Sequence, residues 1–231
     1  SASGASDVLS ALGLNLDISA ERAAEVLRET GITFAFAALH HPGFRHAGPT
    51  RKELGIPTLF NILGPLCNPA RPNASAVGVA SLERVPLVVG VFRTRGATAL
   101  VYRGDDGIDK LTTTGHSHIW EVSRGFVTEH DLDPSDLGIP RADIQSLLGA
   151  DAAHNAGVAR AVLAGEPGPV RDVVLLNAAA GLVAFELSQD PDLLQEPIVD
   201  RLAAQLERAA GVVDSGAAAT KLDEWVTATN R

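Results

Sequence analysis

The chain has 231 residues, of which 45% are hydrophobic and 20% charged, a balance that supports a folded core and argues against a disordered chain. Acidic residues outnumber basic ones, 28 against 19, for a formal net charge of −9. A general nucleic-acid-binding surface is therefore not expected. No apolar run reaches the ~20 residues of a membrane span, and no signal peptide opens the sequence. A single cysteine, Cys67, cannot form an internal disulfide, so we expect a cytoplasmic setting.

The first part of the chain is predicted to form two helices and a strand. Residues 7–13 have helical spacing of apolar side chains. Residues 20–30 have helical composition, with Ser19 as the candidate N-cap and Gly31 as the residue that ends the helix. The apolar run 32–38 is predicted to be a buried strand.

The middle of the chain alternates between strand-like and helix-like segments. Prolines recur through residues 39–72 and prevent a long regular element there. Residues 76–80 and 97–103 are predicted strands, separated by a helix over 82–93 that Gly96 closes.

A hairpin and a helical end complete the prediction. Residues 119–123 and 125–129 read as paired strands that turn at Arg124-Gly125. Four helices follow, over residues 151–163, 170–187, 198–213 and 217–227. Strands that alternate with helices predict an α/β fold with a mostly parallel central sheet flanked by helices, forming one domain over residues 1–231.

The polar loop residues between His40 and Asn68 are the densest candidate site, because α/β folds place their sites on loops at strand ends. Arg51 lies in this segment, and its guanidinium suits a carboxylate ligand. The alternative interpretation is that Arg51 forms an ion pair with Glu53 or is exposed to solvent.

Two further segments have chemical potential. Gly104-Asp-Asp-Gly-Ile-Asp-Lys110 places three Asp after a predicted strand. They would suit Mg²⁺ together with substrate phosphates, or they form an acidic turn at Gly107. Residues 1–7 carry three Ser and a Gly ahead of a helix, which fits either an anion pocket or an ordinary helix cap.

These segments together resemble anthranilate phosphoribosyltransferase over essentially the whole chain. The most specific match is the run Pro57-Thr-Leu-Phe-Asn-Ile-Leu-Gly-Pro-Leu-Cys-Asn-Pro69. The other matching segments are Ser3-Gly-Ala-Ser-Asp-Val-Leu-Ser-Ala-Leu-Gly13, His41-Pro42, Arg51-Lys-Glu-Leu-Gly55, Gly104-Asp-Asp-Gly-Ile-Asp-Lys-Leu-Thr112, Asn155-Ala, Arg171-Asp172, Asn177-Ala-Ala-Ala and Asp214-Ser-Gly216.

The resemblance implies a nucleoside phosphorylase/phosphoribosyltransferase-like α/β catalytic domain, normally joined to a small N-terminal helical domain. It implies transfer of the phosphoribosyl group of phosphoribosyl pyrophosphate (PRPP) to anthranilate, in tryptophan biosynthesis. It further implies Mg²⁺ as the metal, and a homodimer whose contact lies mainly in the helical domain.

The resemblance also implies roles for individual residues on the acceptor side. Arg51 falls where the family's arginine meets the anthranilate carboxylate. His41 and Phe44 would line the anthranilate tunnel.

On the PRPP side, Ser1, Ser3 and Ala5 fall in the segment that touches PRPP, although Ala5 lacks the hydroxyl often found there in the family. Asp109 matches the first residue of the family's Asp-Glu metal pair. Lys110 stands at the Glu position, where its positive charge would repel a metal ion or would contact the pyrophosphate directly.

The sequence contains no Met, even at position 1, so we expect it to be a piece of a longer protein. The family's glycine-rich pyrophosphate loop and helical domain would lie upstream of Ser1. Two alternatives therefore stay open. The chain is a non-catalytic fragment or pseudoenzyme of this family, or it is related to the pyrimidine-nucleoside phosphorylases, which share the fold.

Overall fold

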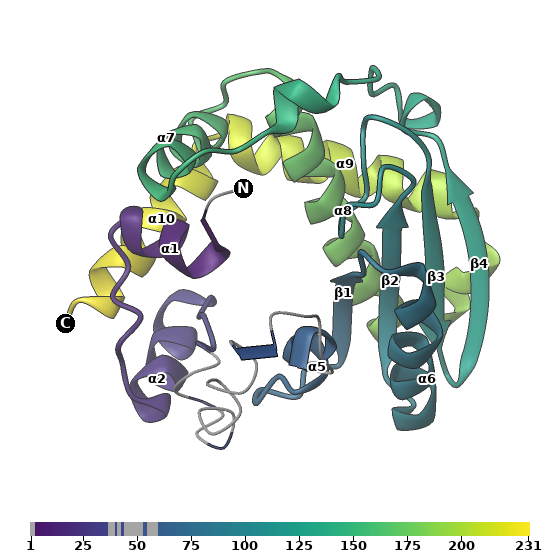
Figure 1. Cartoon of the computed structure of the whole chain (residues 1–231), viewed down its shortest axis with the longest axis horizontal. Coiled ribbons are helices and arrows are strands. Elements are labelled where there is room, and N and C mark those ends of the chain that lie inside the picture. Colours follow the sequence, from purple (N-terminus) through teal and green to yellow (C-terminus); the bar gives the residue numbers. More distant parts are fainter. Residues whose placement is uncertain (1–2, 37–39, 41–42, 44–52, 55–59) are drawn as a thin grey trace. The chain divides into compact units, whose positions relative to one another are not determined.

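The computed structural model describes residues 3–36, 40, 43, 53–54 and 60–231 (Figure 1). The chain divides into two compact units. Unit 1 consists of Ser1–Pro69, Leu148–Glu166 and Val212–Arg231, and unit 2 consists of Ala70–Leu147 and Pro167–Gly211. The single domain expected over residues 1–231 stays a prediction.

The regular elements among the described residues of unit 1 are helices. Its helices are α1 (Ala5–Ala11), α2 (Ala20–Thr30), α5 (Phe60–Leu66), α7 (Ala152–Leu163) and α10 (Ala217–Thr229), and α9 (Ile198–Asp214) enters it at Val212. Helix α1 packs against α7, and α10 packs against both α2 and α7. Leu12, Val26, Leu222 and Trp225 are buried in the core that these helices share. The helices predicted over residues 20–30, 151–163 and 217–227 are confirmed within two residues at each end.

Helix α2 shows why the local signals were reliable. The Ser19 side chain accepts a hydrogen bond from the Arg22 N–H at 3.2 Å, and this satisfies one N–H of the first turn. Gly31 follows in the left-handed conformation, with φ of 79°, and its N–H donates to the Leu27 carbonyl. Both ends of the helix are therefore set by the residues next to them.

The strand predicted over residues 32–38 is wrong for the part that the structure describes, because residues 32–36 form no strand. A strand needs a hydrogen-bonded neighbour, and the described residues of unit 1 contain no strand that residues 32–36 would join. Residues 37–38 lie outside the described part of the chain.

Unit 2 contains a four-stranded sheet with the order β1-β2-β3-β4. The strands are β1 (Ala74–Gly78), β2 (Thr98–Gly104), β3 (Ser117–Ser123) and β4 (Phe126–Leu132). They lie side by side in Figure 1. Strands β1 and β2 are parallel, whereas β2–β3 and β3–β4 are antiparallel. The α/β class is confirmed, but the described sheet is mixed and not mostly parallel.

The connections explain the mixed sheet. Helix α6 (Val85–Arg95) joins β1 to β2 and allows them to run parallel, as a crossover must. The turn Arg124-Gly125, with φ of 50° and 80°, is too short for a crossover and produces an antiparallel hairpin. The hairpin turn was predicted at these two residues and is confirmed.

Helices cover the sheet. Helix α6, which follows the 3₁₀ turn Leu82–Arg84, packs against β2 and β3. Helices α8 (Pro169–Gln189) and α9 contribute Leu176, Ala179, Ala180 and Leu202, all fully buried, to a core shared with Ile119 and other sheet residues. The helix predicted over 170–187 is thus a core helix, as expected.

None of the helices formed by the described residues is long and apolar enough to span a membrane. Three further 3₁₀ turns lie at Pro134–Leu137, Ile144–Leu147 and Pro191–Gln195.

Candidate functional site

The loop that follows β2, residues 104–114, is the candidate site in unit 2, and we call it the acidic loop. It begins where β2 ends, at Gly104, beside the carboxyl end of β1 at Gly78. In α/β sheets the crevices at the carboxyl ends of parallel strands are where ligands bind. The position of the loop therefore matches that of a ligand site in this fold class.

Gly78 allows the acidic loop to lie directly against β1. A Cβ atom at Gly78 would lie 1.7 Å from the Asp109 carbonyl oxygen, which is far below any contact distance. The Asp109 main chain therefore occupies the space that a side chain at Gly78 would fill. The absence of a side chain at the end of β1 decides where Asp109 lies.

Asp106 forms hydrogen bonds within the acidic loop. Its Oδ2 atom accepts hydrogen bonds from the Thr112 and Thr114 hydroxyls, each at 2.6 Å, and its Oδ1 atom accepts one from the Ile108 N–H at 3.2 Å. Partial burial raises the pKa of the Asp106 carboxyl, but these hydrogen bonds outweigh it and hold the pKa below its usual value. Asp106 is thus ionised and engaged within the loop.

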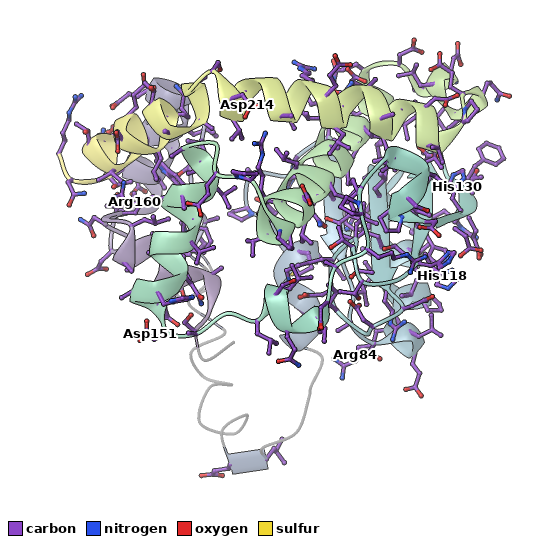
Figure 2. All side chains as sticks on the ribbon, turned by 90° about the horizontal axis from the view of Figure 1, so that it is seen from above. Arg84, His118, His130, Asp151, Arg160 and Asp214 are labelled. Carbon is purple, nitrogen blue, oxygen red and sulfur yellow. The ribbon has the colours of Figure 1, made fainter. Side chains whose placement is uncertain are left out.

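Asp105 points to the β-hairpin. His118 of β3 lies between two carboxylates, with its Nδ1 atom 2.6 Å from Asp131 Oδ1 and its Nε2 atom 3.3 Å from Asp105 Oδ1. Figure 2 labels His118 and His130 on this part of the sheet. The three Asp of the loop therefore do not converge on one point, and the turn at Gly107, with φ of 86°, is the acidic turn that one interpretation of the sequence predicted.

Asp109 and Lys110 are adjacent exposed residues of the acidic loop that pair with each other. Their side chains are 57% and 55% exposed, and the Lys110 ammonium lies 2.5 Å from Asp109 Oδ1. Burial, with a smaller effect of the Asp109 charge, raises the pKa of the Tyr102 hydroxyl to about 12, so Tyr102 remains protonated beside the loop. The Asp109 carboxylate and the Lys110 ammonium thus stand next to each other on the surface of the loop.

The Asp109–Lys110 pair bears on how a metal ion would be bound by the acidic loop. Among the residues that the structure describes, no group of three or more His, Cys, Asp or Glu side chains is arranged to hold one. Mg²⁺ is commonly bound by one or two carboxylates together with substrate phosphates. Asp109 therefore fits a Mg²⁺ ion that also has phosphate ligands, and it does not form a protein-only metal site.

Asn177 of α8 holds the acidic loop from the helix side. Its Oδ1 atom accepts a hydrogen bond from the Leu111 N–H at 3.0 Å, and its Nδ2 group donates to the Leu111 carbonyl at 2.9 Å. Asn177 belongs to one of the segments that resemble the family, but the sequence predicts no contact for it. No local pattern reveals this contact, since 66 residues separate the partners.

Ser3, a residue assigned to PRPP, lies in a polar corner of unit 1. Asn155 of α7 donates through Nδ2 to Ser3 Oγ at 2.9 Å and to the Ala150 carbonyl at 3.1 Å, and it accepts from the Ala150 N–H. Ala5, also assigned to PRPP, is the first residue of α1 and has no side-chain hydroxyl. Asp151 caps α7 and Arg160 lies in its last turn (Figure 2).

Four predicted site residues lie outside the described residues. They are Arg51, His41 and Phe44 on the anthranilate side and Ser1 on the PRPP side. Their assignments remain predictions from the sequence.

A surface cavity of about 550 Å³ opens in unit 1 beside α2 and α10. Glu29, Asp223, Glu224 and Arg231 are among the residues that line it, and none of the predicted site residues does. The cavity is therefore not the candidate site. A smaller cavity, of about 90 Å³, lies beside His118 and His130.

Comparison with known proteins identifies relatives over almost the full chain. Residues 1–219 match the family model described as "Glycosyl transferase family, a/b domain". An anthranilate phosphoribosyltransferase of Clavibacter michiganensis is 75% identical over 229 residues, and one of Leifsonia xyli is 69% identical over the same length. The alignments cover 99% of this chain but 65% and 66% of those proteins, so the chain spans just under two thirds of their length.

Solved structures agree with the sequence comparison. Anthranilate phosphoribosyltransferase from Thermus thermophilus matches with a TM-score of 0.85 and 36% identity, over 98% of this chain and 64% of that one. The Saccharomyces cerevisiae enzyme in complex with PRPP and Mg matches with a TM-score of 0.84, over 98% of this chain and 63% of that one; at 24% identity this match bears on the fold alone. The resemblance inferred from the sequence motifs is confirmed.

Proposed function

The chain belongs to the glycosyl transferase family through its α/β domain, and we propose that it is the larger part of an anthranilate phosphoribosyltransferase. The reaction would transfer the phosphoribosyl group of PRPP to the amine of anthranilate and release pyrophosphate. The observation that carries this proposal is 75% identity to a named anthranilate phosphoribosyltransferase over 99% of the chain. The position of the acidic loop at the carboxyl ends of β1 and β2 supports it.

The proposed reaction needs no protein nucleophile. As pyrophosphate leaves C1 of the ribose, that carbon gains positive character and the anthranilate amine attacks it. The protein contributes chiefly by positioning the two substrates and by stabilising charge. Arg51 would orient the acceptor by binding its carboxylate through two parallel hydrogen bonds.

Asp109 and Lys110 would act on the pyrophosphate side. Magnesium, when bound together with the pyrophosphate, supplies positive charge to the leaving group, and Asp109 is the carboxylate that would hold it. The Lys110 ammonium, 2.5 Å from Asp109, is a second positive charge at the same place. We propose that Lys110 contacts the pyrophosphate directly, as a fixed positive charge in place of a metal ion.

Calorimetry with PRPP and Mg²⁺ on the protein that contains this chain tests the binding half of the proposal. Turnover is tested in the protein that contains this chain, by following the loss of anthranilate fluorescence when PRPP and Mg²⁺ are added. Saturable binding and PRPP-dependent loss of anthranilate are the expected results. If anthranilate is unchanged while the protein is folded and binds PRPP, the transferase proposal is wrong.

Lys110 also motivates a second candidate function, that of a non-catalytic member of the family. Replacing a metal-binding carboxylate by a cation weakens divalent-ion binding. Binding of PRPP without any turnover would favour this candidate. A related assay with thymidine and inorganic phosphate tests the nucleoside phosphorylase alternative, for which release of thymine would be the positive result.

We further propose that the protein containing this chain is a cytoplasmic homodimer. The assembly is tested by light scattering during size-exclusion chromatography, for which a mass twice that of one chain is expected. A monomer at all concentrations would contradict it.

A further inference from the structure

Asn177 uses its side-chain amide as a two-way clamp on one residue of the acidic loop. It accepts from the Leu111 N–H at 3.0 Å and donates to the Leu111 carbonyl at 2.9 Å. The same Nδ2 group donates to the Val173 carbonyl, one turn earlier in α8, at 2.9 Å. This third contact sets the direction of the amide, so the clamp has one orientation relative to the helix.

The clamped residue leads directly to the solvent-facing pair. Leu111 is fully buried in the core of unit 2 and follows Lys110, while Asp109 lies against Gly78 on the other side. The Thr112 N–H donates to the Ser117 hydroxyl at 2.9 Å, which anchors the next residue as well. Asp109 and Lys110 therefore stand between the contact at Gly78 and the clamp at Leu111. Their main chain has little freedom, although their side chains are exposed.

We propose that Asn177 is a positioning residue for the pyrophosphate side of the reaction. It acts through Leu111 to place the Asp109 carboxylate and the Lys110 ammonium. This inference rests on the proposed function, because it assigns the exposed pair to PRPP. It adds that a residue of α8, without touching the substrate, determines PRPP affinity.

The Asn177→Ala variant tests the inference. Alanine keeps the helix propensity of α8 but leaves the Leu111 N–H and carbonyl without partners. In the protein that contains this chain, calorimetry with PRPP and Mg²⁺ should show an affinity about tenfold lower, a factor equivalent to one lost hydrogen bond. The affinity for anthranilate alone should stay unchanged, because that substrate is assigned to Arg51.

Val183→Ala is the matched control. Val183 lies on the same helix, is buried in the same core and takes part in none of the hydrogen bonds described for the acidic loop. Its truncation should lower the unfolding temperature without changing PRPP affinity. A loss of PRPP affinity that simply follows the loss of stability in both variants would overturn the positioning role.

A second variant and a second measurement protect the test against misfolding. Asn177→Asp keeps an acceptor for the Leu111 N–H but removes the donor to the Leu111 carbonyl, so it should also lose PRPP affinity. Hydrogen exchange of the Leu111 amide should accelerate at least about tenfold in Asn177→Ala, while amides of the β2–β3 ladder remain protected. Unchanged exchange at Leu111 would contradict the clamp.

The outcomes separate the two proposals. If the unmodified protein that contains this chain does not bind PRPP with Mg²⁺, the proposed function fails, and the positioning role fails with it. If that protein binds PRPP and its Asn177→Ala variant binds it equally well, the positioning role alone fails and the proposed function stands.

Discussion

Arg201 of α9 donates two hydrogen bonds to the carboxylate of Glu121 in β3, at 2.6 and 2.8 Å, from a position 80 residues away in the chain. Both side chains are buried, with exposed fractions of 5% and 0%. His130 of β4 lies 3.0 Å from Glu121 Oε2. The pair ties the helical layer of unit 2 to its sheet. Because both charges are withdrawn from water, each depends on the other.

Arg201→Met should destabilise the chain strongly. The variant leaves the Glu121 carboxylate buried with His130 as its remaining described partner, and breaking a buried pair in this way costs about 3–5 kcal/mol of unfolding free energy. Urea denaturation followed by circular dichroism measures it. Arg208→Met is the control on the same helix, since the exposed Arg208–Glu186 contact of 3.6 Å should contribute less than about 1 kcal/mol. Equal losses in the two variants would contradict the importance of burial.

The Glu121 pair should also give the stability a pH dependence. Burial alone raises the pKa of the Glu121 carboxyl, but the hydrogen bonds from Arg201 and His130 outweigh it and leave the pKa below its usual value of 4.5. A carboxyl with a lowered pKa in the folded state contributes stability that is complete above pH 4.5 and is lost as the pH falls through the folded-state pKa. The contribution of Glu121 should therefore shrink only in acid.

Urea denaturation of the unmodified chain and of Glu121→Gln over a range of pH measures this contribution. The difference in unfolding free energy between them should be constant above pH 4.5 and should narrow below it. A difference that widened as the pH fell would mean that the sign of the pKa shift is wrong.

Gly78→Ala should displace the acidic loop. The new Cβ would lie 1.7 Å from the Asp109 carbonyl oxygen, so either β1 or the loop must move. We expect a loss of about 1–3 kcal/mol in unfolding free energy, the usual cost of overpacking, together with weaker PRPP binding. Gly90→Ala is the control, because nothing lies within 4 Å of its Cβ position in α6. Gly90→Ala should raise the unfolding free energy by about 0.5–1 kcal/mol, because alanine is more favourable than glycine inside a helix. The prediction fails if Gly78→Ala is as stable as the unmodified chain.

Lys110→Glu should strengthen divalent-metal binding in the presence of pyrophosphate. The change replaces an ammonium beside Asp109 by a second carboxylate, and both the lost repulsion and the added ligand favour the ion. Electron paramagnetic resonance with Mn²⁺ and inorganic pyrophosphate should show an affinity at least about tenfold higher, equivalent to about 1.4 kcal/mol. Arg93→Glu makes the same change in net charge at an exposed position of α6 and should leave Mn²⁺ affinity unchanged. An equal gain in both would indicate a general charge effect.

Arg51→Ala should raise the KM for anthranilate in the protein that contains this chain. The guanidinium is predicted to bind the acceptor carboxylate, and loss of a charged hydrogen bond costs about 1.5–3 kcal/mol, roughly a 10- to 150-fold change. Arg51→Lys retains the charge without the two-point geometry, so its KM for anthranilate should lie between those of the unmodified protein and of Arg51→Ala. Steady-state kinetics with each substrate varied in turn provides the measurement. If the KM for anthranilate is unchanged, Arg51 has no role in binding it.

Local sequence signals predicted the elements whose causes lie within a few residues. The bounds of α2 follow from Ser19 and Gly31, and the hairpin follows from two residues, Arg124 and Gly125, that adopt positive φ. The segment of residues 32–36 has strand-like composition but forms no strand among the described residues. Its composition is necessary for a strand, but pairing with a neighbour decides the outcome.

The sequence by itself determined the family, the α/β class, most helix ends and the residue types of the candidate site, because all of these depend on short-range pattern and on matching motifs. Only the tertiary structure decided which partner each of the three Asp of the acidic loop has, since His118 lies beside Asp105 and the Thr112 and Thr114 hydroxyls donate to Asp106. It likewise decided the contacts of Asn177 with Leu111 and of Arg201 with Glu121. These partners are 66 and 80 residues apart, and no local interaction links residues at such separations until packing brings them together.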